Sequence, residues 1–217
     1  MIGQVVGNYR LVQKVGEGGM GAVYEAVRED IGSRAAIKVL HKELALNPEM
    51  ATRFFNEARA ANLVQHPAIV RVFDYGTTST GTAYLAMEFL EGESLRTRLL
   101  RVRQLSEAVT VRIGRQIASG LATAHASQVV HRDLKPENIF MVPDAEAPSG
   151  ERAKILDFGI ANHTCDFSVG NWRFLFVIGK CLGIPQRRGI RANGEGCGIA
   201  TYARPRSIPF QYRIGSA

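Results

Sequence analysis

Two short polar stretches constrain this chain more than any of its other features. The first is VHRDLKPEN at residues 130–138, and the second is DFG at residues 157–159. Among their residues are the carboxylates of Asp133 and Asp157, a lysine and an amide, within a short span of sequence. Oxygen ligands of this kind hold Mg²⁺, and a lysine can offset the negative charge of a phosphoryl group. The chain therefore needs a fold that brings both stretches to one cleft, where a phosphoryl group could be moved.

A glycine-rich turn lies between two expected strands near the start of the chain. The strands are residues 9–15 and 22–27, and GEGGMG lies between them at residues 16–21. Backbone N–H groups can approach phosphates where no Cβ intervenes, although an ordinary glycine turn explains the pattern alone equally well. A dinucleotide-binding fold requires a helix directly after the glycines, whereas VYEAV at residues 23–27 is typical of a strand. The context favours a hairpin that covers phosphates.

A single lysine, Lys38, lies inside the next apolar run, RAAIKVL at residues 34–40. Taken alone it could be a lysine on an edge strand, but after a glycine lid a lysine directed at the α- and β-phosphates is favoured. A helix is expected to follow, because Asn47 is a suitable N-cap and Pro48 fits the first helical position. Glu57 on this helix could pair with Lys38 and fix its position, or it could be solvated surface.

Two more strands and a second helix follow. Strands are expected at residues 69–75 and 82–89, which gives a five-stranded, antiparallel small lobe, and residues 90–94 are a natural linker. From Ser106, a plausible N-cap, apolar residues recur with an i, i+4 spacing that predicts an amphipathic helix. That apolar stripe consists of Val109, Ile113, Ile117, Leu121 and Ala124.

With these motifs in order, the chain resembles the eukaryotic-like (Hanks-type) serine/threonine protein kinases common in bacteria. The resemblance covers about residues 9–161 and depends on five motifs: the glycine turn, the lysine strand, the helix with Glu57, HRDLKPEN and DFG. It implies an α+β fold of two lobes. Residues 9–90 would form the N-lobe, a five-stranded antiparallel sheet with one helix. Residues 91–161 would form the first part of an incomplete helical C-lobe.

The resemblance also implies roles for the matching residues, with ATP and Mg²⁺ as the bound groups. Asp133 would accept or orient the proton of the substrate hydroxyl, Lys135 would offset charge on the γ-phosphoryl group, and Lys38 would grip the α- and β-phosphates. Asn138 and Asp157 would hold the metal. A lysine two residues after Asp133 is the pattern of kinases that act on protein serine and threonine.

The resemblance further implies how the nucleotide would be contacted. The adenine would lie between Val23 and Ala36 of the N-lobe and Phe140 of the C-lobe. The backbone of Glu88 and Leu90 would make the hinge hydrogen bonds, and Met87 would lie at the back of the pocket. His131 is expected to be a packing residue. The residues that would contact ATP are Val15, Gly16, Gly18, Gly21, Val23, Ala36, Lys38, Glu57, Met87, Glu88, Leu90 and Phe140.

After residue 161 the family pattern stops. Residues 162–217 hold eight Lys and Arg against Asp166 and Glu195, so they carry +6 of the net charge of +7, and they contain all three cysteines. They show no sustained periodicity. A disordered or frame-shifted tail is expected, with a genuine divergent extension as the alternative. Without the remaining C-lobe helices, the stripe of the 106–126 helix would be exposed, and transfer activity would be weak or absent.

Three functions follow from these observations. The first is a serine/threonine protein kinase, and the second is an ATP-binding kinase fragment without the substrate-binding half of the C-lobe. The third, a binder of nucleic acid through the basic tail, is the weakest, because the basic residues lie on no recognisable helix or aromatic platform. No nucleic-acid partner is therefore expected. Neither a signal peptide nor a run long enough to span a bilayer is evident, so a cytoplasmic protein is expected.

Overall fold

The computed structural model describes residues 1–78, 80–158, 178–179, 181 and 183. The expectations for the rest of the tail, and for Gly159 at the end of DFG, lie outside these residues. Within them the chain is an α+β structure with two antiparallel sheets and four α-helices.

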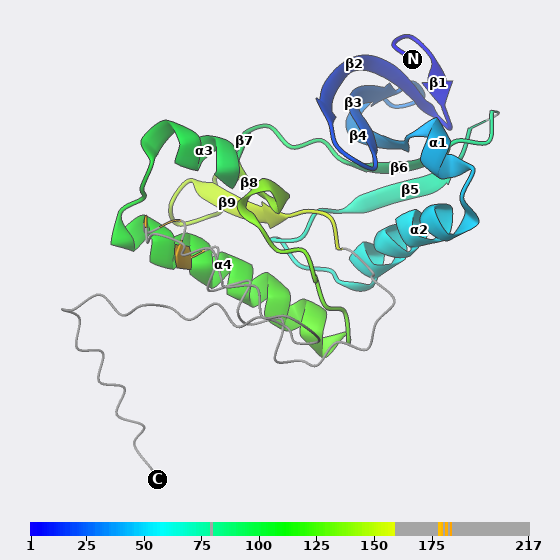
Figure 1. Ribbon diagram of the computed structural model, residues 1–217. Helices are drawn as coiled ribbons and strands as arrows, with labels where there is room; N and C mark the ends of the chain where they lie inside the picture. The colour runs from blue at the N-terminus through cyan, green and yellow to red at the C-terminus, as the bar shows by residue number, and fades with distance from the viewer. Residues whose placement is uncertain (79, 159–177, 180, 182, 184–217) are drawn as a thin grey trace. The chain divides into compact units, whose positions relative to one another are not determined.

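The first sheet is built from the strands that the sequence predicts. Its strands are all antiparallel and follow the order β1-β2-β3-β4-β6-β5 (Figure 1). The five-stranded prediction is confirmed, with one further strand, β1, of two residues at the edge beside β2. The strands are β1 (Val5–Val6), β2 (Tyr9–Glu17), β3 (Gly21–Arg28), β4 (Ser33–Leu40), β5 (Val72–Thr77) and β6 (Ala83–Glu88).

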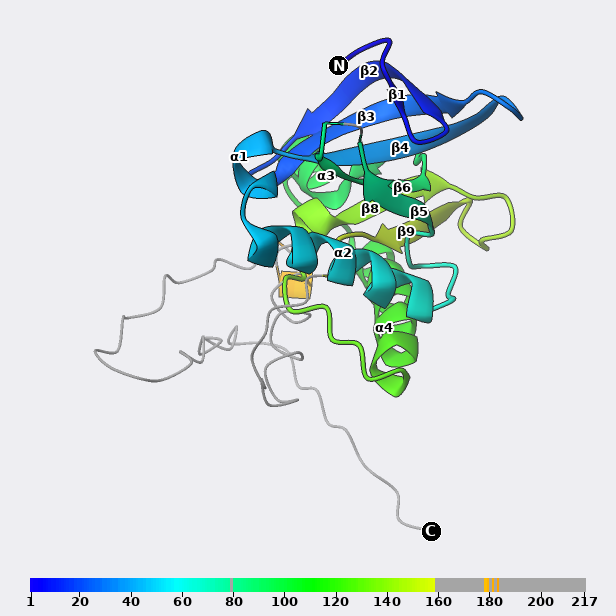
Figure 2. The same cartoon turned by 90° about the vertical axis from the view of Figure 1, so that its right-hand side faces the viewer.

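Helix α2 (Pro48–Leu63) follows the short α1 (Lys42–Ala45) and packs against β5 and β6 (Figure 2). Its start is fixed as the sequence predicts, because the Asn47 side chain accepts a hydrogen bond from the Glu49 N–H at 2.9 Å and Pro48 occupies the first turn. Phe54 and Ala58 are fully buried beneath the sheet. Burial of this apolar face is what holds the helix on the sheet.

The second sheet has the order β7-β8-β9, with strands β7 (Glu93–Ser94), β8 (Ile139–Pro143) and β9 (Glu151–Ile155). The loop between α2 and β5 is hydrogen-bonded directly to it. The Val70 N–H donates to the Ile155 carbonyl at 3.0 Å, and the Ile155 N–H donates to the Ala68 carbonyl at 2.7 Å. These main-chain bonds fix the loop after α2 to the strand that leads to Asp157.

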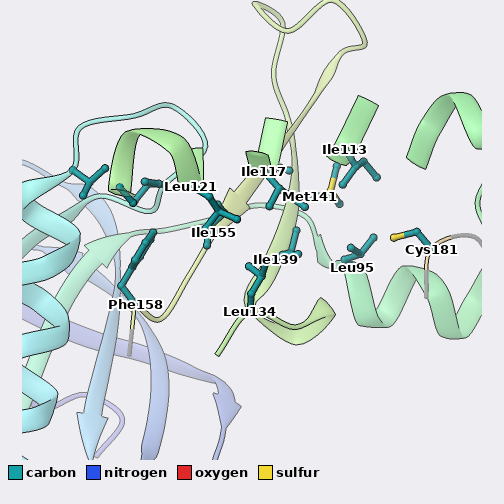
Figure 3. Packing of buried hydrophobic residues seen from close by; sticks show 14 of the residues in the cluster. Leu95, Ile113, Ile117, Leu121, Leu134, Ile139, Met141, Ile155, Phe158 and Cys181 are labelled. Atoms are coloured by element: carbon teal, nitrogen blue, oxygen red, sulfur yellow. The ribbon is translucent and has the colours of Figure 1, made fainter. Parts of the chain in front are cut away.

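Helix α4 (Glu107–Ala126) lies against β9, and Ser106 caps it as predicted. The sequence predicted an exposed apolar stripe here, and this is wrong for Ile113, Ile117 and Leu121, which are all buried. Figure 3 shows them in one cluster with Ile139, Met141 and Ile155 of the second sheet. Side chains from β8 and β9 pack against these three residues, which were expected to be exposed.

Helix α3 (Leu95–Val102) was not predicted, because the linker was expected to lead directly toward the later helix. Ser94 caps it by accepting a hydrogen bond from the Thr97 N–H at 3.0 Å, and Leu95 is fully buried. In the parts of the chain that the structure describes, no helix is both long and apolar enough to cross a membrane.

Ion pairs connect α3 to both edge strands of the second sheet, β7 and β9. The Arg98 guanidinium donates to Glu93 at 2.9 Å and to Glu151 at 2.8 Å. The hydrogen bond from Arg98 is the main cause that lowers the pKa of both carboxyls below their ordinary value. A lowered pKa stabilises the fold above the unfolded pKa of glutamate, and this contribution is lost as the pH falls through the folded value.

Replacing Arg98 by methionine is expected to lower the free energy of unfolding by about 2–3 kcal/mol at pH 7, since charge-assisted hydrogen bonds are lost. The difference from the wild type should shrink below about pH 4, where the glutamates of the unfolded chain are protonated. Urea unfolding at pH 7 and pH 3.5 measures both effects. Arg10→Met, which removes an exposed pair with Glu29, is the matched control and should cost less than about 1 kcal/mol. A pH-independent loss for Arg98→Met would contradict this account.

Candidate active site

The lysine of the third long strand meets the aspartate of DFG. Lys38 lies in the middle of β4, paired with Val23 of β3 and Leu85 of β6. Its Nζ lies 2.8 Å from Oδ1 of Asp157, which follows β9. The Lys38 side chain is 10 % exposed, whereas that of Asp157 is 42 % exposed. A nearly buried ammonium group therefore meets a carboxylate that still faces solvent.

A second charged group is assembled within the HRDLKPEN stretch. Lys135 Nζ lies 2.6 Å from Oδ2 of Asp133. The amide nitrogen of Asn138 donates to the Asp133 carbonyl at 2.9 Å and to Asp133 Oδ2 at 3.3 Å. Because its nitrogen is turned toward Asp133, Asn138 presents its oxygen in another direction. Lysine, aspartate and asparagine thus form one compact unit.

Residue Leu156 joins the two stretches through its backbone. Its N–H donates to the Asn138 carbonyl at 2.9 Å, and its carbonyl lies 2.8 Å from the His131 Nε2. The His131 ring also lies against Phe158, with 4.8 Å between the ring centroids, and both side chains are buried. The residue before Asp157 is thereby fixed to both ends of the loop that carries Asp133.

Sequence reasoning missed this role of Leu156. The only signal was its position directly before DFG, since main-chain hydrogen bonds leave no mark on residue type. The backbone of Asp157 itself has a positive φ of 56°, a conformation that is uncommon for a residue other than glycine. This geometry turns the chain so that the Asp157 carboxylate can reach Lys38.

Most of the residues expected to hold the adenine lie in one apolar cluster. Ala36 and Met87 face each other across β4 and β6 and are buried, and Val23, Leu90 and Leu156 pack against the same cluster. Phe140 lies on β8 and is half-buried, and Val15 on β2 is exposed. This cluster therefore contains most of the side chains that were expected to contact the adenine.

Two residues expected at the site, Glu88 and Glu57, need separate description. The Glu88 N–H donates to the Arg71 carbonyl at 2.9 Å, and the Glu88 carboxylate accepts from the Arg71 N–H and from Lys154. The Glu88 backbone can therefore offer a ligand its carbonyl, but not its N–H. Glu57 lies on α2, but its side chain lies outside the described residues, so its expected pairing with Lys38 stays a prediction.

The surroundings of the glycines in the turn differ from one position to the next. A Cβ on Gly16 or Gly18 would meet nothing within 4 Å, so the backbone there borders open space. A Cβ on Gly21 would lie 2.1 Å from the Val39 carbonyl oxygen of the neighbouring strand. The Gly18 N–H donates to the Gly21 carbonyl at 2.9 Å and closes the turn. Gly16 and Gly18 thus border a free surface, and Gly21 is required for strand packing.

These surroundings predict that two alanine substitutions have unequal effects on the free energy of unfolding. Gly21→Ala forces β3 and β4 apart and should lower the free energy of unfolding by about 1–3 kcal/mol, as overpacking does. Gly16→Ala enters open space and should change it by less than about 0.5 kcal/mol. Urea unfolding of the two variants measures the difference. Equal destabilisation by both would contradict the strand packing described here.

The charged groups suit a hard divalent cation held together with a phosphate. Among the described residues, no three His, Cys, Asp or Glu side chains lie close enough to hold a metal by themselves. Mg²⁺ usually takes one or two carboxylates and completes its shell with phosphate oxygens and water. Asp157 and the oxygen of Asn138 supply oxygen donors of the right kind, and Lys38 lies beside them to neutralise phosphate charge. The residues present therefore fit a metal-bound nucleotide.

A separate cavity of about 550 Å³ is lined by hinge residues and strand ends, and Lys38 and Asp133 do not line it. Two ion pairs lie on its walls, Lys154 with Glu88 and Arg152 with Asp144. Because Lys38, Asp133, Asn138 and Asp157 do not line it, the candidate site is the one around Lys38 and Asp157.

Comparison with known proteins gives a consistent result. The family model for the protein kinase domain matches residues 9–168. Serine/threonine-protein kinase Pkn1 of Myxococcus xanthus is 46 % identical over 162 residues, which are 74 % of this chain and 22 % of the relative. Serine/threonine-protein kinase PknA of Mycobacterium tuberculosis is 42 % identical over 159 residues, 71 % of this chain and 36 % of the relative. The chain thus spans about a fifth to a third of these relatives.

Solved structures with the same arrangement are also found. The crystal structure of the Mycobacterium tuberculosis PknI kinase domain aligns with a TM-score of 0.72 and 24 % sequence identity. The alignment covers 86 % of this chain and 79 % of that one. At this level of identity the likeness establishes the fold, a kinase-like mixture of a strand-rich lobe and a second lobe.

Proposed function

We propose, since this chain belongs to the protein kinase domain family, that it binds ATP with Mg²⁺ and transfers the γ-phosphoryl group to serine or threonine hydroxyls of proteins. The observation that carries this proposal is the junction at Leu156. It holds Asp157, which pairs with Lys38, next to the loop that carries Asp133 and Asn138. The groups for phosphate binding, metal binding and proton acceptance are therefore fixed relative to one another.

Residues of the first sheet would bind the nucleotide. Gly16 and Gly18 would let backbone approach the phosphates, because open space lies beside them. Lys38 would exchange its contact with Asp157 for the α- and β-phosphates. Met87, Ala36 and Val23 would bury the adenine in their apolar cluster. Each of these contacts positions the nucleotide, and positioning is the main requirement of phosphoryl transfer.

The HRDLKPEN loop would supply the groups at the reacting end. Asp133 would accept or orient the proton of the substrate hydroxyl. Lys135, whose Nζ lies 2.6 Å from the Asp133 carboxylate, would move toward the γ-phosphoryl oxygens as their charge develops. Asn138 and Asp157 would hold Mg²⁺, which when bound neutralises charge on the phosphates.

The choice of serine and threonine is supported by two facts. Lys135 follows Asp133 by two residues, which is the pattern that the sequence resemblance associates with these acceptors. The relatives that cover most of the matched region are serine/threonine-protein kinases by name. Protein tyrosine is the acceptor that these facts disfavour.

Incubation of the purified chain with Mg²⁺, γ-labelled ATP and a generic protein substrate tests the proposal. Labelled phosphate should appear on serine and threonine, and it should disappear in Asp133→Asn. Binding of ATP is followed separately by thermal shift with and without Mg²⁺. The Gly16→Ala variant is informative here, because it should keep its stability and lose affinity for ATP. Absence of any ATP-dependent shift in the wild-type chain would overturn the proposal.

The second candidate is an ATP-binding kinase fragment that does not turn over. It is favoured by the fact that the family match ends at residue 168 of 217. In that case ATP with Mg²⁺ should stabilise the chain, while phosphate transfer to protein stays at the level of Asp133→Asn. The two assays together separate the two functions.

A further inference from the structure

We infer that the tail docks in cis, through residues 178, 179, 181 and 183, at the corner between α3 and α4 and completes the core there. Cys181 is fully buried, and it belongs to the same apolar cluster as Leu95, Leu105 and Ile113. In Figure 3 it lies at one end of that cluster beside Leu95, and Phe158 lies toward the other end. A residue far along the tail thus closes a core that is otherwise built from residues 60–158.

The segment is held by the backbone as well as by apolar contact. The Leu105 N–H donates to the Cys181 carbonyl at 2.9 Å. Leu105 lies just before Ser106, the N-cap of α4, and is buried, so its backbone N–H needs a hydrogen-bond partner. The docked segment therefore satisfies a donor at the corner that the preceding loop leaves open.

Small residues allow this close approach. Gly179 is buried. Gly183 has a φ of 68°, and a Cβ on it would lie 3.2 Å from the Gln104 side chain. Cysteine in such a position acts as a small apolar side chain. Gly179, Cys181 and Gly183 are thus small residues at this corner, and the occupant is this chain's own tail.

The site of docking bears on the rest of the large lobe. Helix α3 contacts the short helix Pro136–Asn138, which contains Asn138. A segment that covers the end of α3 and the start of α4 supports both helices from one side. This inference does not depend on the proposed function, because it concerns the core and not the chemistry of Lys38 or Asp133.

The first test measures thiol accessibility in the full chain. Cys165 and Cys197 are replaced by serine, so that Cys181 is the only thiol, and its reaction with a disulfide reagent is followed at pH 8. Reaction in buffer should be at least about 100-fold slower than in concentrated urea, as for a group exposed only by local opening. Burial also raises the pKa of this thiol to about 11, which further slows the reaction. A native rate within about fivefold of the unfolded rate would overturn the inference.

The second test asks whether the segment docks at the proposed corner. Amide hydrogen exchange of Leu105 should be slow in the wild type and in Cys181→Ala, which keeps a small apolar side chain. In Cys181→Asp it should become at least about 100-fold faster, while the amide of Ile117 in the middle of α4 stays protected. If Leu105 exchanges equally fast in all three proteins, the segment does not dock there. If Cys181→Asp fails to fold, the thiol measurement and the Leu105 exchange of the wild type still decide the matter.

Discussion

Asp157→Asn is expected to remove most of the Mg²⁺-dependent stabilisation by ATP and to lower phosphoryl transfer by about 10³-fold, the size of effect expected when one group that stabilises the transition state is lost. The substitution keeps the shape of the side chain and removes its charge. It therefore weakens the metal site and also ends the ion pair with Lys38 that measures 2.8 Å.

The measurement is a thermal shift on adding ATP, taken with Mg²⁺ and with a chelator for each protein. Comparing each variant with itself separates nucleotide binding from any change in the stability of the unliganded protein. Asp30→Asn is the matched control, because Asp30 is exposed and pairs with Arg28, away from the residues of the candidate site. If Asp157→Asn showed the same Mg²⁺-dependent shift as the wild type, Asp157 would not be a metal ligand.

Ile117→Ala is expected to lower the free energy of unfolding by about 2–5 kcal/mol, the usual cost of removing a large side chain from a packed core. Ile117 is fully buried in the cluster between α4 and the second sheet. The loss would be a large fraction of the stability of an ordinary domain. Urea unfolding at pH 7 measures it.

Val111 provides the control on the same helix, because its side chain is 53 % exposed. Val111→Ala should change the free energy of unfolding by less than about 0.5 kcal/mol. Equal and small effects of the two substitutions would mean that the α4 stripe is exposed, as the sequence alone suggested. Unequal effects would establish that this part of the chain forms a core of its own.

The first sheet and α2 were predictable because their signals are local. Each signal is visible within a few residues: the strand-like runs, the Asn47-Pro48 cap, and the spacing of Phe54 and Ala58. The burial of α4 was not predictable in this way, because Ile117 is covered by strands that come later in the sequence. Helix α3 was missed, since a helix of eight residues directly after a linker gives a weak periodic signal.

In the candidate site, too, the residue types were predictable and the backbone arrangement was not. The residue types in HRDLKPEN and DFG predicted a metal and phosphate site, and the structure brings Lys38 and Asp157 together. What residue types could not predict is the backbone junction at Leu156 and the positive φ of Asp157. Nothing in the residue types placed Cys181 in the core either, because the tail that contains it shows no sustained periodicity.

The hydrogen bonds from Val70 and Ile155 have a mechanical consequence. They fasten the loop after α2 to β9, the strand that ends two residues before Asp157. Any motion of the first sheet that leaves both bonds intact must keep this loop and β9 together.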